Sequence, residues 1–279
     1  MKISPRYDGP VVVAIDDDPT GQLVPVTRQR KRFQEILAEL TDQEWGHQSR
    51  CEAWTTRDVV AHLVSVTEFW NLSVAAGLAG EPTRWLAGFD PAATPPQLVD
   101  AMNALSTTEV LDRFVAANDA LLVTLAGLAP EQWSMPAESP AGHVPIQLVA
   151  QHALWDSWIH ERDVMIPLGL PLVEEPDEVI SSLKFAAVVS PVLGIGVGQA
   201  EVAACQLGIE ATDPSVRFIV EVDDRVTLRN DAPTPGVPCL RGAAAELTDV
   251  LTLRRPLDPS TPIEWREFLG GLEAAFDAV

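Results

Sequence analysis

The hydrophobic pattern of the first 172 residues is that of amphipathic helices. Apolar residues recur three and four positions apart in long segments, as they do on the buried face of a helix. Four segments show this pattern: residues 27–40, 55–78, 106–126 and 143–166. Two of them begin with a possible capping box, formed by Thr55 and Asp58 or by Ser106 and Glu109. We therefore predict an antiparallel four-helix bundle over residues 27–172.

The pattern changes after Pro171. Short runs of β-type residues, some strictly alternating, replace the long helical segments. These runs cover residues 203–209, 216–222 and 226–228, and helical patterns are found at 180–192, 242–253 and 263–276. We predict a second, smaller α+β domain over residues 175–279, so the fold class of the whole chain is α+β.

The N-terminal segment is different again. Residues 1–26 contain Pro and Gly and have no helical periodicity, so we predict an extended arm. One β-type run within it, Val11–Ile15, predicts a single edge strand. A loop is expected between the first two helices, at residues 41–54.

The fourth predicted helix has ionisable residues where apolar ones are expected. At about 100° per residue, one face spanning about 120° holds Leu148, His152, Asp156, Ile159, His160 and Asp163. Burying ionisable groups costs several kcal/mol unless they are paired or bind a metal. Asp156 and His160 stand one turn apart, and this spacing allows two side chains to bind one metal ion.

The second predicted helix directs another histidine inward. His62 shares its apolar face with Val59, Val66, Phe69 and Trp70. Two interpretations stay open at this point. Either the histidines are hydrogen-bonded core residues, with His160 and Asp156 as an ion pair, or His62 joins Asp156 and His160 in a metal site.

Composition narrows the classes of partner. The 279 residues are 47% hydrophobic, enough for a sizeable core, and 40 acidic against 19 basic residues give a net charge of −21. Such a chain repels nucleic acid and anionic membranes, because it has no basic stripe to neutralise phosphates. We expect neither as a partner. No run approaches the roughly 18 consecutive apolar residues of a membrane span.

Targeting and cysteine patterns indicate a cytoplasmic protein. The N-terminal apolar run is short and leads into aspartates, unlike a signal peptide. The three cysteines, Cys51, Cys205 and Cys239, are far apart and form no CxxC motif. Neither a disulfide framework nor a thiolate zinc site is therefore expected.

Three segments resemble a known family. The stretches CEAWTTRDVVAHL (51–63) and DSWIHERDVMIPLG (156–169) resemble those of mycothiol-dependent maleylpyruvate isomerases, and LRGAAAELTDVLTLRRP (240–256) is similar to a C-terminal segment of that family. The resemblance covers roughly residues 27–275. It implies a DinB-like four-helix bundle followed by a small α/β domain.

The resemblance also implies a metal site. The family binds a divalent metal, typically zinc, and the matching residues are His62, Asp156 and His160. The usual carboxylate is Glu, and the shorter Asp156 leaves room for His152 or Asp163 as an alternative or outer ligand. The family's C-terminal arginine corresponds to Arg254, with Arg255 as the alternative. Leu253 stands where the family often has Gly.

The expected function is thiol chemistry. Two histidines and one carboxylate leave an open metal position, where a low-molecular-weight thiol, mycothiol, would ionise. No cysteine of the chain is expected to be well placed, so the thiol is a co-substrate. The thiolate would attack an electrophilic small molecule, giving isomerisation or S-transfer, and Arg254 would hold a substrate carboxylate.

Two other functions remain open. One is a non-catalytic small-molecule-binding or regulatory protein on the same bundle, and the other is a metal-assisted hydrolase. For the enzyme, we expect the site at the junction of the two domains, because the chain leaves the fourth helix soon after His160.

Overall fold

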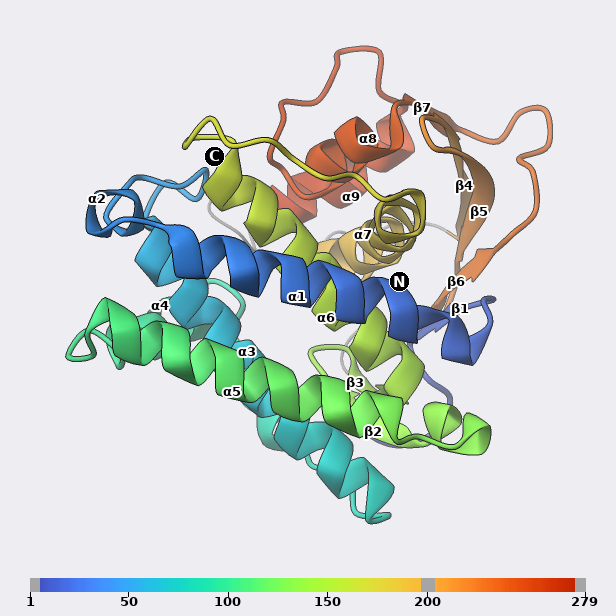
Figure 1. Cartoon of the computed structure of the whole chain (residues 1–279). Coiled ribbons are helices and arrows are strands. Elements are labelled where there is room, and N and C mark those ends of the chain that lie inside the picture. Colours follow the sequence, from blue (N-terminus) through green and yellow to red (C-terminus); the bar gives the residue numbers. More distant parts are fainter. Residues whose placement is uncertain (1–5, 197–203, 274–279) are drawn as a thin grey trace.

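The structure, a computed structural model, describes residues 6–196 and 204–273. Four long helices lie on one side of the molecule and a twisted sheet lies on the other (Figure 1). The four are α1 (Leu23–Glu39), α3 (Thr56–Leu78), α5 (Thr107–Ala126) and α6 (Ile146–Met165). The predicted α+β class and the predicted helical bundle are both confirmed.

Both predicted capping boxes are present. The Thr55 side chain accepts a hydrogen bond from the backbone N–H of Asp58, whose carboxylate accepts one from the N–H of Thr55. Ser106 and Glu109 form the same reciprocal pair at the start of α5. These contacts satisfy N–H groups that have no partner within the helix, so they define where each helix begins.

The connections between the long helices contain more structure than predicted. A third capping box, Thr41 with Glu44, starts the short helix α2 (Asp42–Trp45), where we expected only a loop. Helix α1 begins four residues before the predicted Thr27. The other short elements are η1 (Pro19–Gln22), η2 (Trp85–Gly88), α4 (Thr94–Asp100) and η3 (Pro130–Ser134).

The predicted start of α6 is wrong. His143 belongs to strand β3 (Gly142–Pro145), which pairs antiparallel with β2 (Pro136–Ser139), and the helix begins only at Ile146. Gly142 has a φ of +94°, and a Cβ there would lie 2.0 Å from the carbonyl oxygen of Arg6. Only glycine allows the N-terminal arm to approach the hairpin so closely.

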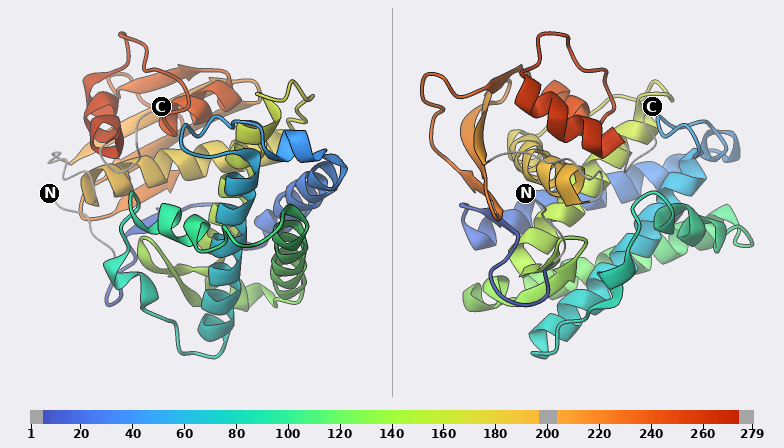
Figure 2. Two further views of the ribbon diagram at one scale, coloured as in Figure 1. Left: turned by 90° about the vertical axis from the view of Figure 1, so that its left-hand side faces the viewer. Right: turned by 180° about the vertical axis from the view of Figure 1, so that it is seen from behind.

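The second half of the chain packs around helix α7 (Pro176–Gly196). Within the described residues the sheet has five strands in the order β1-β6-β5-β4-β7. The strands are β1 (Val13–Ile15), β4 (Cys205–Thr212), β5 (Ser215–Val222), β6 (Val226–Arg229) and β7 (Cys239–Gly242). Helices α8 (Ala244–Leu251) and α9 (Ile263–Glu273) pack on α7, and Figure 2 shows the sheet on the side of α7 away from the bundle.

The N-terminal arm supplies the edge strand that its sequence predicted. Val13 pairs with Val226 and Ile15 with Leu228 in a parallel register. The arm therefore belongs to the C-terminal sheet. Strand β7 was not predicted: the sequence pattern predicts no element for residues 239–241 and begins a helix at Gly242, which ends the strand instead.

One hydrophobic core runs across both halves. The larger buried cluster contains Trp158 of α6, Phe185 of α7 and Phe218 of β5. The predicted domain boundary near residues 172–175 lies in the connection between α6 and α7, but the core crosses it. Each large buried side chain contributes roughly 1.5–3 kcal/mol. The burial of the α6 side chains that face α7 therefore requires the C-terminal half.

Helix α3 meets the length and composition of a membrane span. Its 18-residue window of highest hydropathy averages 1.3, yet 56% of that window is buried inside the protein. The helix packs against α5 and α6. Its apolar character is explained by this position in the bundle.

Candidate metal centre

His62, Asp156 and His160 come together between α3 and α6. The Nε2 atom of His62 lies 3.6 Å from Oδ1 of Asp156, and Nε2 of His160 lies 3.7 Å from the same oxygen. All three ligand atoms lie within 4.8 Å of one another. Ligands about 2.1 Å from a tetrahedral zinc ion are about 3.4 Å apart, so this spacing suits a shared cation.

The hydrogen bonding of the three residues is incomplete without a cation. The contacts of 3.6 and 3.7 Å are longer than good hydrogen bonds. Oδ2 of Asp156, the second oxygen of this candidate ligand, is buried and has no hydrogen-bond partner in the described parts of the chain. A buried polar atom without a partner costs about 1–3 kcal/mol. The donor set and its geometry therefore fit a divalent metal.

Asp156 is ionised at this site. Burial alone would raise the pKa of its carboxyl group, but the neighbouring imidazoles of His62 and His160 hold the pKa well below its usual value. The carboxylate therefore gives the candidate centre one negative charge at neutral pH.

The ring of His160 is oriented from behind by Asp163. Nδ1 of His160 lies 2.9 Å from Oδ2 of Asp163, so Nδ1–H donates to the carboxylate and Nε2 faces Asp156. Burial lowers the pKa of His160, but the hydrogen bonds with Asp163 and Cys51 and the charge of Asp156 raise it to about 10. A cation that binds to the metal-free protein must therefore displace a proton from the His160 ring.

Asp163 is held in turn by two arginines. Nε of Arg50 donates to Oδ1 at 2.9 Å, and Nε and Nη2 of Arg254 donate at 3.1 Å. The carboxylate is completely buried. Because two guanidinium groups already balance its charge, Asp163 serves as an outer partner of His160.

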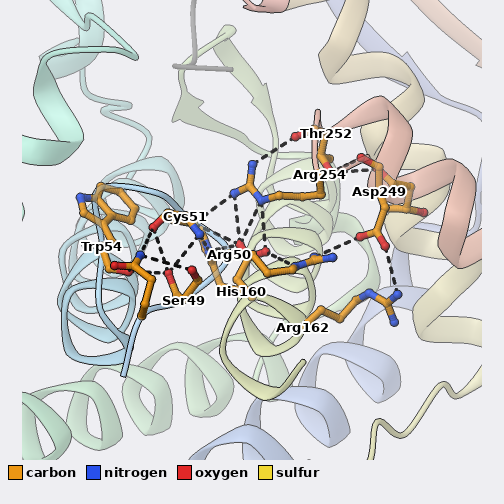
Figure 3. Close-up of polar contacts among 12 residues, drawn as sticks. Ser49, Arg50, Cys51, Trp54, His160, Arg162, Asp249, Thr252 and Arg254 are labelled. Atoms are coloured by element: carbon orange, nitrogen blue, oxygen red, sulfur yellow. Dashed lines mark hydrogen bonds and ion pairs between the residues drawn. The ribbon is translucent and has the colours of Figure 1, made fainter. Parts of the chain in front are cut away.

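A second cluster of possible ligands contains Cys51, His160 and Asp163. Sγ of Cys51 lies 3.3 Å from both Asp163 Oδ2 and Arg254 Nη2, and 4.0 Å from His160 Nδ1. The guanidinium of Arg254 supplies the positive charge at this position, as Figure 3 shows. A metal cation here would meet the two arginines, so the first cluster is the better candidate.

Cys51 thus lies beside the candidate centre, on the Nδ1 side of His160, and the supply of the reacting thiol by a co-substrate stays a prediction. Cys51 belongs to a loop that Gln48 holds together, because its Nε2 donates to the carbonyls of Cys51 and Trp54 at 2.9 Å. The backbone N–H of Ser49 also donates to the carbonyl of Trp54. A signal was present in the sequence, since Cys51 closely precedes the cap of the helix that carries His62.

Arg254, rather than Arg255, is the arginine at this site. The segment after α8 places the Arg254 guanidinium against Asp163, whereas Arg255 pairs with Glu246 at the surface. Leu253 has a φ of +59°, a conformation that favours glycine. The resemblance led us to expect glycine at this position, and the backbone conformation of Leu253 is one that glycine adopts more easily.

Further ion pairs join α6 to the C-terminal half beside the site. Asp249 of α8 accepts hydrogen bonds from Arg50 at 3.1 Å and from Arg162 at 3.2 Å. Arg162 also pairs with Glu174. The C-terminal half thus forms one wall next to His160.

His152 does not join the cluster. Its ring stacks on Phe185 with centroids 4.7 Å apart and also contacts Trp70 at 5.2 Å. Among the described residues it makes no hydrogen bond to Asp156. Burial lowers the pKa of His152 to about 4, so the ring is neutral at physiological pH. It contributes to aromatic packing one turn from the candidate ligand.

Aromatic contacts surround the two candidate histidine ligands. The ring of Trp54 lies 5.1 Å from that of His62 with a tilt of 32°, and 6.3 Å from that of His160. The two imidazoles meet edge to face at 5.0 Å. A hydrophobic shell of this kind limits water and strengthens electrostatic interactions within the site.

The bundle, the small sheet-containing half and the paired histidines define a DinB-like protein. The chain belongs to the family described as mycothiol maleylpyruvate isomerase N-terminal domain, which matches residues 26–165. No curated protein matches the chain.

Two solved structures are similar over most of their length. One is a crystal structure of the mycothiol-dependent maleylpyruvate isomerase, with a TM-score of 0.62 and 15% identity. The other is a histidine-to-alanine mutant of such an isomerase, with a TM-score of 0.60 and 16% identity. Each comparison covers 88% of this chain and 97% of the other. At this identity the similarity concerns the fold.

Proposed function

We propose that the chain is a metal-dependent enzyme that activates a low-molecular-weight thiol, mycothiol, for attack on an electrophilic small molecule. The observation that carries this proposal is the convergence of His62 Nε2, Asp156 Oδ1 and His160 Nε2 within 4.8 Å. Membership of a family described by mycothiol and maleylpyruvate isomerase supports the choice of thiol and of isomerisation.

His62, Asp156 and His160 would hold the metal, for which we propose zinc. A divalent metal lowers the pKa of a bound thiol, so that a thiolate exists at neutral pH. Asp163 keeps the proton of His160 on Nδ1, which leaves Nε2 free to face the ion. Trp54 covers the His62 ring and limits access of water.

The thiolate would add to a double bond of the electrophile that is conjugated to a carbonyl. Rotation about the resulting single bond, followed by loss of the thiolate, gives cis–trans isomerisation. If a different group leaves, the same addition ends as S-transfer. The addition gives an enolate, and its collapse expels the same thiolate, so the isomerisation consumes no proton. The proton that the thiol loses when it ionises passes to solvent.

Arg254 is the proposed contact for a substrate carboxylate. Its Nε and Nη2 donate to Asp163, and Nη1 donates to the carbonyl of Thr252 at 3.1 Å. A bidentate clamp would need Asp163 to release the guanidinium. We therefore propose a single hydrogen bond from the remaining Nη1–H, together with the positive charge that Arg254 shares with Arg50.

We further propose a cytoplasmic location and small molecules as the partners. The thiol chemistry requires a reducing compartment, and Cys51, Cys205 and Cys239 are all unpaired. The substrate class is an unsaturated carbonyl compound that carries a carboxylate.

The test is an assay of the purified protein with maleylpyruvate, with and without mycothiol, together with its metal content. We expect about one divalent metal per chain and isomerisation only when thiol is present. Protein without metal would favour a binding or regulatory role. Protein with metal that acts on substrates without thiol would favour a hydrolase. His62→Ala is the matched inactive control.

A further inference from the structure

Arg30 of α1 is a completely buried cation at the centre of the bundle. Its Nε and Nη2 donate to the carbonyl of Ala153 at 3.2 and 2.9 Å, and its Nη1 donates to Thr67 at 3.1 Å and to Asn118. All of these acceptors are neutral. Within the described residues, no carboxylate forms an ion pair with Arg30.

A buried charge without an ion-pair partner is unusual in this chain. Arg32, on the same helix, contacts both Glu161 and Glu178 at 2.8 Å. The nearby Arg162 contacts Asp249. An unpaired buried charge is costly, and the contact of Arg30 with the face of Trp70 at 5.4 Å offsets only part of this cost.

Arg30 contacts α6 at Ala153, about one turn before the candidate ligand Asp156. In an α-helix each carbonyl points toward the C-terminal end and accepts from the residue four positions later. The carbonyl of Ala153 therefore directs the guanidinium toward the turn that contains Asp156. The Thr67 contact places the same guanidinium against α3, which carries His62.

Asp156 is the buried negative charge of this region. Its Oδ2 has no hydrogen-bond partner in the described chain. Burial lowers the pKa of Arg30 to about 10, while the charge of Asp156 acts to raise it. No ion pair or hydrogen bond joins the two groups within the described residues, so the charge of Asp156 acts on Arg30 through space.

We propose that Arg30 is a positioning residue that sets the charge of the candidate metal centre. Its fixed positive charge balances Asp156 in the metal-free protein. When a divalent cation is bound, Arg30 adds to the positive potential around it. The consequences are a weaker metal affinity and a stronger pull on the electrons of a bound thiol. This inference rests on the proposed function.

A purely structural role would have different consequences. Arg30 joins α1 to α3, α5 and α6 through hydrogen bonds, and such a cross-link would be insensitive to nearby charge. Asn118→Asp separates the two roles. The substituted carboxylate has the shape of the amide, keeps the hydrogen bond with Nη1 and neutralises the guanidinium.

The experiment measures Zn²⁺ and Co²⁺ affinity by competition with a chelator at neutral pH. Asn118→Asp should bind both ions at least tenfold more tightly than the wild type, because a repulsive charge in a low-dielectric region has been neutralised. The Co²⁺ absorption bands should stay unchanged, which shows that the ligands are the same. Ala120→Asp is the control, since it adds an equal charge to the exposed side of α5, where solvent screens it.

A second pair of variants tests the same inference if Asn118→Asp does not fold. Arg30→Lys keeps the charge and should keep the wild-type affinity, whereas Arg30→Gln removes the charge and should bind more tightly. Equal affinities across the wild type, Asn118→Asp and Arg30→Gln would overturn the inference but leave the proposed function intact. A wild type that binds neither ion would overturn the proposed function itself.

Discussion

Nδ1 of His160 lies 2.9 Å from Oδ2 of Asp163, three residues further along the same helix. The same carboxylate accepts hydrogen bonds from Arg50 and Arg254. One buried side chain thus orients a candidate metal ligand and connects it to the C-terminal half. Outer partners of this kind fix the ring and raise its basicity.

Asp163→Asn should therefore weaken metal binding by about tenfold to a hundredfold. It also leaves two arginines without their shared counter-charge, so the free energy of unfolding should fall by about 3 kcal/mol or more. Chelator competition and urea unfolding measure the two effects. Asp249→Asn is the matched control, because it removes a carboxylate from Arg50 and Arg162 without touching His160. Equal loss of metal affinity in both variants would contradict the role of Asp163.

His62→Ala and His160→Ala should each abolish metal binding, because each removes a nitrogen that faces Asp156. Elemental analysis after purification without chelator gives the occupancy. His152→Gln should keep the metal, since His152 packs on Phe185 and makes no hydrogen bond to Asp156 in the described structure. Full occupancy in both alanine variants would show that the ligands lie elsewhere.

Arg254→Ala should keep the metal and reduce turnover by about tenfold or more, since a charge-assisted hydrogen bond to a substrate carboxylate contributes about 1.5–3 kcal/mol. The measurement is kcat/KM for the thiol-dependent reaction alongside metal content. Arg255→Ala is the control in the neighbouring position, because Arg255 pairs with Glu246 at the surface. If the two variants have the same activity, Arg254 has no part in the reaction.

Local patterns were sufficient to predict the helices that carry the candidate site. The capping boxes at Thr55 and Ser106 depend on residues three positions apart. The one-turn spacing of Asp156 and His160 on α6 likewise follows from the helical period. These signals are contained in short windows of sequence. From these signals alone a hydrogen-bonded core and a metal site stayed open as alternatives. The resemblance to the isomerase family then named His62, Asp156 and His160 as candidate ligands.

The features that were missed depend on distant contacts. Each strand of hairpin β2–β3 has only four residues, and glycine is needed at position 142 because the backbone of Arg6 lies against it. The contact of Cys51 with Asp163 and Arg254 joins residues more than 100 positions apart. A single sequence has no periodic signal for such contacts, because they arise only when the loop and the C-terminal half meet.

The shared core determines how the C-terminal half can be tested. A chain that ends near Pro171 would contain the candidate metal ligands but not the C-terminal half. In the structure Trp158 of α6 lies in the same buried cluster as Phe185 and Phe218, which such a chain would lack. Exposing this surface should destabilise the bundle, so substitutions in the full-length protein are the better test of the C-terminal half.

The stability of the metal-free protein should depend on pH through two histidines with opposite signs. The pKa of His152 is lowered by burial to about 4, below its unfolded value near 6.5. As the pH falls from 6.5 to 4, the unfolded chain binds a proton that the folded chain excludes. The free energy of unfolding should therefore decrease by roughly 3 kcal/mol over this window.

His160 acts in the other direction. Its pKa is raised to about 10, because the hydrogen bond with Asp163 outweighs the effect of burial, so its contribution is complete below pH 6.5 and is lost as the pH rises toward 10. The midpoint of urea unfolding, measured between pH 4 and 10 on protein freed of metal with a chelator, should thus be highest near pH 6.5. His152→Gln should flatten the acidic side and leave the alkaline side unchanged, whereas Asp163→Asn should flatten the alkaline side. If the stability of His152→Gln still decreases as the pH falls from 6.5 to 4, this decrease arises from groups other than His152.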